Sequence, residues 1–216
     1  VDVFASGSKV ESLSDERVHD SGGRLTLRIF QCKKPVIGAI NGAAVGIGAT
    51  MQLPMDFRLA SDTARFGFVF ARRGIVPEAA SSWFLPRLVG MQQALEWCMT
   101  GRVFDAAEAL KGGLVRSVHA PADLLPAAQE LAREIADNTA PVSIALTRAM
   151  LWRLTAADHP MAAHQIDSRA IYRRSRSGDA KEGISSFLEK RAPVYPDKVS
   201  TDLPDFFPWW DEPAYK

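Results

Sequence analysis

Residues 35–55, PVIGAINGAAVGIGATMQLPM, constrain the fold of this chain more than any other stretch of the sequence. The segment PVIGAIN begins with a proline and continues with apolar, β-branched residues, which predicts a short buried strand. Residues 42–55 are small and apolar, and they predict a tightly packed helix that is entered through glycines. The first half of the chain is therefore expected to combine short buried strands with close-packed helices.

The rest of the chain divides into a region of further strands and a long helical region. FRLAS (57–61) and ARFGFVF (64–70) predict short strands, whereas residues 21–33 fit either a helix or a strand. Residues 1–20 are polar and irregular and predict a loop, and the tail 193–216 is too rich in proline to form a regular element. From residue 79 onward the helical period dominates, with helices predicted at 91–101, 105–113, 122–138, 142–154, 161–176 and 179–191.

Length and composition exclude several classes of function. The chain has 216 residues, of which 47% are hydrophobic and 24% charged, which suits one domain or one domain with a helical appendage. A formal net charge of +1 gives no general attraction to nucleic acid or to an acidic membrane surface. No long apolar run predicts a transmembrane helix. We expect a cytoplasmic protein in which Cys32 and Cys98 are reduced core thiols.

The glycine-rich segment 41–49, NGAAVGIGA, is the first candidate site. It contains neither the lysine and serine or threonine of a phosphate-binding loop nor the G-x-G-x-x-G pattern. Its glycines would let the backbone approach a ligand, so that N–H groups at a helix start could form an oxyanion hole. Small residues also permit close packing of a helix against a strand, and the pattern alone leaves both interpretations open.

Glu78 is the second candidate, since it is one carboxylate in the otherwise apolar stretch VPEAASSWFL. A proline followed by an acid favours the first turn of a helix, which gives Glu78 a purely structural interpretation. The apolar residues around it would instead desolvate the carboxylate and raise its pKa, as a catalytic base requires. The four histidines are scattered, and no metal site is expected.

Several motifs in the same order resemble the crotonase superfamily, also known as the enoyl-CoA hydratase/isomerase family. The resemblance covers residues 30–193 and rests on KPVIGAINGAAVGIGATMQLPMDFRLASDTARFG, RRGIVPEAASSWFLPRLVG, ALEWCMTGRVFDAAEALKGGLV and EGISSFLEKRAP. It implies an α/β fold, a spiral of ββα turns over residues 1–140, followed by a helical trimerisation region and tail over residues 141–216. Homotrimers, or hexamers made of two trimers, are the implied assembly.

The resemblance also implies a substrate and part of its binding site. Members of the family bind an acyl-CoA thioester and stabilise its enolate with two backbone N–H groups. One donor would be Ile47 together with its neighbour Gly46 in the glycine-rich motif. The other would lie in a loop upstream of residue 1, so we expect the chain to be incomplete at its N-terminus. No metal or separate cofactor is implied, because coenzyme A is part of the substrate.

Departures from the family's pattern narrow the predicted reaction. Hydratases of the family carry two glutamates, and this sequence has Thr50 and Phe70 at those positions. Glu78 falls where Δ3,Δ2-enoyl-CoA isomerases carry their acidic base, and PEAASS resembles their PE-x-x-SS stretch. We therefore expect isomerisation of 3-enoyl-CoA to 2-trans-enoyl-CoA in fatty acid metabolism, with Glu78 as the base and Thr50, Phe70 and Trp83 lining the pocket.

Two alternatives remain open at this stage. The chain could be an enoyl-CoA hydratase or another crotonase-fold lyase or hydrolase, or it could bind acyl-CoA without catalysis. Lys190 and Arg191 of FLEKR could contact the phosphates of coenzyme A, although a solvated helix end is the alternative interpretation.

Overall fold

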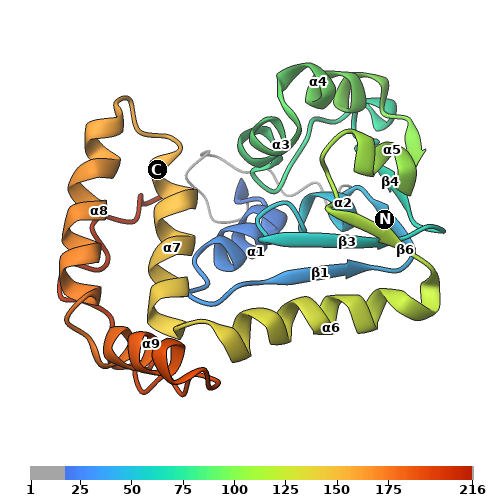
Figure 1. The fold of residues 1–216 in the computed structure, drawn as a ribbon. Helices are drawn as coiled ribbons and strands as arrows, with labels where there is room; N and C mark the ends of the chain where they lie inside the picture. Colours follow the sequence, from blue (N-terminus) through green and yellow to red (C-terminus); the bar gives the residue numbers. More distant parts are fainter. Residues whose placement is uncertain (1–17, 216) are drawn as a thin grey trace.

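Two small sheets form the centre of the protein, in a computed structural model that describes residues 18–215 (Figure 1). In the first sheet, β3 (Phe57–Ser61) lies between β1 (Ile37–Ile40) and β6 (Ser117–His119), and all three strands are parallel. Ile37 pairs with Phe57, and Leu59 pairs with Ser117. The strands predicted at PVIGAIN and FRLAS are therefore confirmed, and the structure pairs them with each other.

The second sheet places β4 (Arg65–Gly67) between β2 (Ala43–Val45) and β5 (Val103–Asp105). The pairing of β2 with β4 is parallel, and that of β4 with β5 is antiparallel. The first four strands alternate between the sheets, since β1 is followed by β2 and β3 by β4. The chain therefore winds as a spiral. The pairing of Val45 with Gly67 brings the ends of β2 and β4 together near the glycine-rich candidate site.

One long helix covers the first sheet, and shorter helices lie near both sheets. Helix α6 (Pro121–Asn138) packs along β1 and β3, where Leu124 and Ala128 bury Leu59. The shorter elements are α1 (Ser21–Phe30), α2 (Ile47–Thr50), the 3-10 turn η3 (Ala71–Arg73), α3 (Ser81–Val89), α4 (Met91–Thr100) and α5 (Ala106–Lys111).

Two of the predicted elements differ in the structure. The helix predicted over residues 42–55 is wrong for most of its length, because this stretch contains strand β2 and only four residues of helix α2. These small residues form a strand because they pair with β4. Their sequence has no periodicity that would predict this strand. Strands β5 and β6 lie in the region that was predicted to be helical, and each has only three residues.

The C-terminal helices extend away from the two sheets (Figure 1). They are α7 (Pro141–Leu154), α8 (Pro160–Arg174) and α9 (Gly178–Glu189), and the first two begin at a proline, which suits the first helical position. The predicted boundary at residues 140 and 141 falls where α6 gives way to α7. The division into two regions nevertheless stays a prediction.

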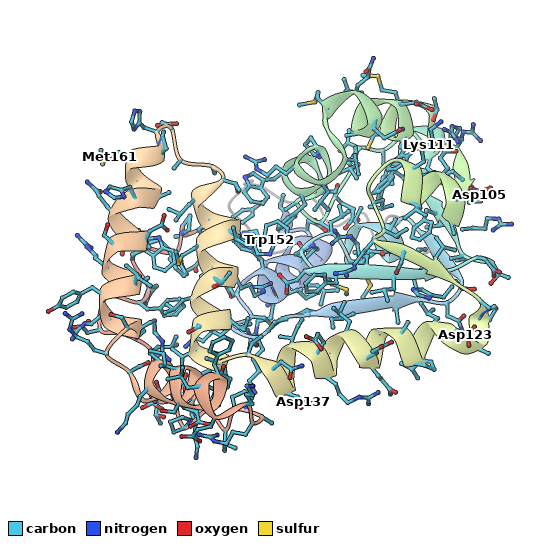
Figure 2. All side chains as sticks on the ribbon, viewed as in Figure 1. Asp105, Lys111, Asp123, Asp137, Trp152 and Met161 are labelled. Carbon is cyan, nitrogen blue, oxygen red and sulfur yellow. The ribbon has the colours of Figure 1, made fainter. Side chains whose placement is uncertain are left out.

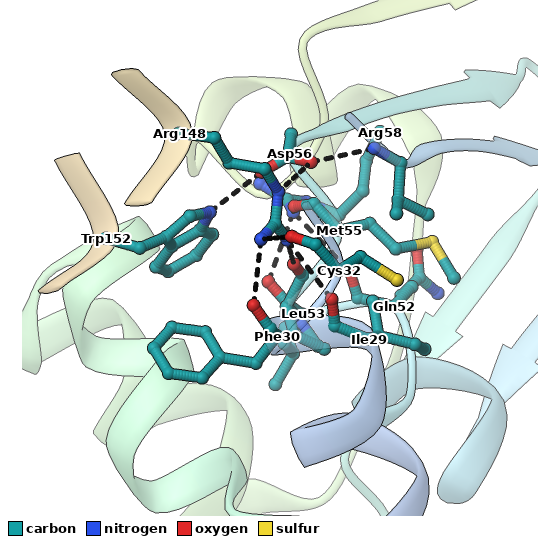
Figure 3. A network of polar contacts seen from close by, with 12 residues as sticks. Ile29, Phe30, Cys32, Gln52, Leu53, Met55, Asp56, Arg58, Arg148 and Trp152 are labelled. Atoms are coloured by element: carbon teal, nitrogen blue, oxygen red, sulfur yellow. Dashed lines mark hydrogen bonds and ion pairs between the residues drawn. The ribbon is translucent and has the colours of Figure 1, made fainter. Parts of the chain in front are cut away.

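A buried ion pair fixes α7 to the rest of the chain (Figure 3). Arg148 Nε donates to Asp56 Oδ2 at 2.8 Å, and Trp152 Nε1 donates to Asp56 Oδ1 at 2.8 Å. The Arg148 guanidinium also donates to the carbonyls of Ile29 (3.2 Å) and Phe30 (2.8 Å) in the last turn of α1. Because carbonyls at a helix end have no partner within the helix, Arg148 also holds α1 in place.

The C-terminal tail is irregular, as predicted, and it lies along the helices of its own chain. Arg153 of α7 pairs with Glu212 at 2.7 Å and stacks on Trp210 at 3.8 Å. Further along, the Tyr215 ring lies 3.6 Å from the ring of His19. Figure 2 shows Trp152 on the side of α7 that faces the sheets. The centroid of its ring lies 5.8 Å from that of the Phe30 ring, in an edge-to-face arrangement.

The helices of residues 18–215 include none that is both long and apolar enough to cross a membrane. The predicted loop over residues 1–20 lies almost wholly outside the described residues.

Candidate functional site

Glu78 lies in a tight turn before helix α3, and the prediction that it occupies the first turn of a helix is wrong. Helix α3 begins at Ser81, and the two preceding residues are left-handed, with φ of 59° at Ala79 and 53° at Ala80. Ser81 closes the turn, since its N–H and its hydroxyl donate to the Glu78 carbonyl at 3.0 and 2.6 Å. The turn therefore fixes the backbone of Glu78 independently of the helical ladder.

The carboxylate of Glu78 lies between α2 and α1. The hydroxyl of the fully buried Thr50 donates a hydrogen bond to Glu78 Oε1. A Cβ at Gly22 would lie 2.0 Å from Glu78 Oε2 and 2.8 Å from Ile47 Cδ1, so these two side chains flank the same point. Only glycine at position 22 leaves room for the carboxylate in this position.

The surroundings of Glu78 favour its protonated form. Burial raises the pKa of this half-buried carboxyl above its ordinary value, and the negative charge of Asp20 raises it further. The hydrogen bond from Thr50 opposes them by stabilising the carboxylate, but burial is the larger effect. A raised pKa brings a carboxyl group closer to the range in which it exchanges protons at neutral pH.

Ile47, whose side-chain tip lies beside this carboxylate, supplies a backbone N–H at the start of α2. The Gly46 N–H already donates to the Gly67 carbonyl at 3.0 Å, so Gly46 is not the free donor that the sequence analysis included. The Ile47 N–H, at the first position of α2, has no acceptor among residues 18–215. Gly46 makes the turn possible, because its φ of 58° and ψ of −126° suit glycine. Of the two predicted donors, Ile47 and not Gly46 therefore has a free N–H among the described residues.

The other predicted pocket residues lie in different environments. Phe70 belongs to the apolar core and has only 5% of its surface exposed, which leaves little surface for a ligand. Trp83 packs in an aromatic cluster with Phe30 and Trp152, at ring distances of 5.7 and 6.4 Å. The structure thus brings Thr50 together with Glu78, whereas the pocket roles of Phe70 and Trp83 stay predictions.

Lys190 and Arg191 lie at the end of α9, which Figure 1 shows well separated from α2. Arg191 makes two hydrogen bonds to Glu182, at 2.6 and 2.9 Å, and a third to Glu189 at 2.6 Å. Lys190 ends the helix in a left-handed conformation, with φ of 55°. Their contact with the phosphates of coenzyme A stays a prediction. In the single chain, Arg191 pairs with carboxylates of α9 and Lys190 ends the helix.

The described part of the chain contains no cluster of three histidine, cysteine or acidic side chains that could hold a metal ion. Cys32 and Cys98 are free thiols, but both are half-buried and not fully in the core as predicted.

Two residues that the sequence analysis missed hold the turn of Glu78. Asp20 Oδ2 accepts a hydrogen bond from the Ala79 N–H at 2.5 Å, and the Thr26 hydroxyl donates to the Ala79 carbonyl at 2.9 Å. Thr26 belongs to α1, and Asp20 is the N-cap of the same helix. An aspartate before a helix is recognisable as a cap. Nothing in the sequence indicates its contact with a residue 59 positions away.

Comparisons with known proteins show which family this chain resembles. A family model described as enoyl-CoA hydratase/isomerase matches residues 2–198. An enoyl-CoA hydratase of Alternaria alternata is 48% identical over 181 residues, which is 83% of this chain and 60% of that relative. A 1,2-epoxyphenylacetyl-CoA isomerase of Escherichia coli strain K12 is 34% identical, over 81% of this chain and 66% of that relative.

The fold has a counterpart among solved structures. A probable enoyl-CoA hydratase/isomerase from Mycobacterium abscessus superposes with a TM-score of 0.81 at 31% identity, covering 91% of this chain and 75% of the other. The chain spans 60% of the length of the Alternaria relatives that it matches. From its sequence and its fold alike, the chain belongs to the enoyl-CoA hydratase/isomerase family of the crotonase superfamily.

Proposed function

We propose that this protein is an acyl-CoA enzyme that stabilises a thioester enolate and converts 3-enoyl-CoA to 2-trans-enoyl-CoA. One observation carries the proposal: Glu78, a carboxyl group with a raised pKa, is hydrogen-bonded to Thr50 of α2, the short helix whose first N–H, that of Ile47, has no acceptor among the described residues. A base next to a hydrogen-bond donor is what proton abstraction α to a carbonyl requires.

In the proposed reaction, the Ile47 N–H donates to the thioester oxygen while the Glu78 carboxylate removes a proton from C2. The negative charge moves onto the oxygen, where the hydrogen bond stabilises it. Loss of one such donor costs about 3 kcal/mol of transition-state stabilisation in other enzymes. The protonated Glu78 then returns its proton to C4, which completes the shift of the double bond and regenerates the base.

The described residues carry no acid at the two positions that hydratases of the family use, and this favours isomerisation over hydration. Addition of water needs a group that positions and deprotonates it, and the acids that hydratases of the family use are replaced by Thr50 and Phe70. Thr50 is engaged with Glu78, and Phe70 lies in the core. Asp20, another carboxylate near Glu78, accepts hydrogen bonds from three backbone N–H groups and therefore has a structural role.

Hydration of 2-enoyl-CoA is the second candidate function, because the Alternaria relatives are named enoyl-CoA hydratases. Glu78 would then act alone on a water molecule. A protein that binds acyl-CoA without turnover is the third.

We also propose that the C-terminal helices associate the protein into homotrimers or hexamers. Helix α9 supports this assembly because its large apolar residues face solvent in the single chain. Phe187 is 81% exposed, Leu188 72% and Ile184 63%. An apolar surface of this kind is typical of a protein interface.

The decisive experiment measures isomerisation of a 3-enoyl-CoA and hydration of a 2-enoyl-CoA by the full-length protein and by Glu78→Gln. Isomerisation should fall by about 10²–10⁴-fold, the usual contribution of a general base. Glu130→Gln, the same change on the exposed face of α6, is the matched control and should leave the rate unchanged.

Three results would contradict the proposal in different ways. An unchanged rate in Glu78→Gln would exclude Glu78 as the base. Hydration that is faster than isomerisation would favour the second candidate. Tight binding of acyl-CoA without turnover, and without exchange of the C2 protons in deuterated water, would favour the third.

A further inference from the structure

The turn that carries Glu78 has a backbone conformation that its own residues disfavour. Ala79 and Ala80 are both left-handed, with φ of 59° and 53°. A residue with a Cβ rarely adopts this region, because its Cβ comes too close to the following carbonyl oxygen. Two consecutive residues of this kind persist only where the surrounding structure holds them. Residues outside the turn must therefore stabilise this conformation.

Helix α1 contacts both polar groups of Ala79. The Ala79 N–H donates to Asp20 Oδ2 at 2.5 Å, and the Ala79 carbonyl accepts from the hydroxyl of Thr26 at 2.9 Å. Thr26 is fully buried, so its hydroxyl has no access to water. The two α1 side chains thus fix the backbone immediately after Glu78 from both sides.

The contact with the turn is more than the capping of α1 requires. Asp20 caps α1 through the N–H groups of Gly22 and Gly23, each at 2.9 Å, and these two bonds already satisfy the helix start. Thr26 lies in the second turn of α1 and takes no part in the cap. The bonds to Ala79 are additional, and they reach across 59 and 53 residues of sequence.

The other end of α1 is fixed as well. Arg148 donates to the carbonyls of Ile29 and Phe30 and is itself paired with Asp56 in the core. The helix is therefore anchored at both ends, and its position relative to the Glu78 turn is defined.

We propose that Asp20 and Thr26 are positioning residues for Glu78, which fix the Ala79 peptide groups and thereby the direction in which the Glu78 carboxylate projects. They act through Glu78 and make no contact with the substrate. The kinetic consequence rests on the proposed function of Glu78, whereas the structural consequence does not. A displacement of about 1 Å in a catalytic group can cost about 100-fold in rate.

The test compares Thr26→Val and Asp20→Ala with Asp105→Ala. Thr26→Val keeps the shape of the side chain and replaces its hydroxyl with a methyl group, which removes the hydrogen bonds to the Ala79 and Gly23 carbonyls. Asp105 is the matched control, because it caps α5 through the Glu108 N–H at 2.8 Å and belongs to no part of the proposed site. Isomerisation kinetics give kcat and KM for each variant, and thermal unfolding verifies that each is folded.

We expect kcat to fall by about 10–100-fold in Thr26→Val and Asp20→Ala, with KM changed by less than about threefold. Asp105→Ala should keep the kcat of the parent protein although it loses a helix cap. Thr26→Ser, which restores a hydroxyl, should recover most of the lost kcat. An equal loss of kcat in Asp105→Ala would reduce the effect to general destabilisation and overturn the inference.

A measurement without substrate separates this inference from the proposed function. The carboxyl carbon of Glu78 can be followed by carbon-13 NMR in protein with labelled glutamate, with Glu78→Gln to assign the resonance. Its chemical shift and titration should change in Thr26→Val and not in Asp105→Ala. If the chemical shift and titration change in Thr26→Val but the protein has no isomerase activity, the proposed function is refuted and the positioning role is supported. If neither the resonance nor kcat responds to Thr26→Val, the positioning role is refuted.

Discussion

Replacing Gly22 with alanine tests the geometry of the site by adding a single methyl group. The new Cβ would lie 2.0 Å from Glu78 Oε2, whereas contacts below 3.0 Å essentially do not occur. The carboxylate oxygen must therefore move by about 1 Å, and Ile47 Cδ1, at 2.8 Å, must also shift slightly. A displacement of this size leads us to expect a loss of about 100-fold in kcat, or about 2.7 kcal/mol in the activation free energy.

The same substitution should cost little stability. The atom nearest to the new methyl group is the end of a flexible side chain, which can rotate away, whereas the Ala79 Cβ at 3.1 Å needs to shift by only a few tenths of an ångström. Alanine also has the higher helix propensity, by up to about 1 kcal/mol within a helix. We therefore expect a midpoint of thermal unfolding that is equal to or slightly above that of the parent protein, together with a large loss of activity.

The assay measures isomerisation kinetics and thermal unfolding on the same preparations. Gly183→Ala in α9 is the matched control, because a Cβ there meets the Tyr195 ring at an ordinary 3.6 Å. It should keep kcat and gain stability to a similar extent. Full activity in Gly22→Ala would refute the position that we give to the Glu78 carboxylate, and a large drop in stability would refute the reasoning on the flexible side chain.

Four further predictions follow from contacts described above. Thr50→Val removes the hydrogen bond that lowers the Glu78 pKa, so the acid limb of kcat against pH should move to higher pH; a move to lower pH would contradict this. Because the pKa of Glu78 is raised on folding, its ionisation destabilises the protein as the pH rises above the unfolded value of about 4.3. Glu78→Gln should therefore be more stable than the parent protein at pH 7 in urea unfolding, with a difference that vanishes below about pH 4. Arg148→Met leaves the Asp56 carboxylate without its buried partner, and the free energy of unfolding should fall by about 3–5 kcal/mol; a loss below about 1 kcal/mol would show that the pair contributes little. Phe187→Ser should shift the protein to smaller species in light scattering, and an unchanged mass would exclude this face of α9 from the interface.

The sequence predicts most helices and the two longest strands because their signals are local. Helix α5 begins after the N-cap Asp105, and helix α4 ends at Gly101, as the capping patterns indicate. The three-residue strands have no such signal, since three residues are too few to establish a period of two. Residues 43–45 form a strand because β4 is available to pair with them, which only the folded chain reveals.

The candidate site was predictable only in part, for a related reason. The sequence and its resemblance to a family identify Glu78, Thr50 and Ile47, which the structure brings together. Pro77 before Glu78 resembles a helix start, but the bonds from α1 to Ala79 hold the chain in a left-handed turn and delay the helix to Ser81. Those bonds span more than 50 residues, so no local pattern could indicate them.

The stacking of Tyr215 on His19 has a practical consequence for work with this protein. His19 is followed directly by Asp20, the residue that holds the turn of Glu78. A fluorescent label attached to residue 215 would therefore lie next to the start of α1. Such a label adds bulk beside the turn that carries the proposed base, so residue 215 should be left unmodified when kinetic constants are compared between variants.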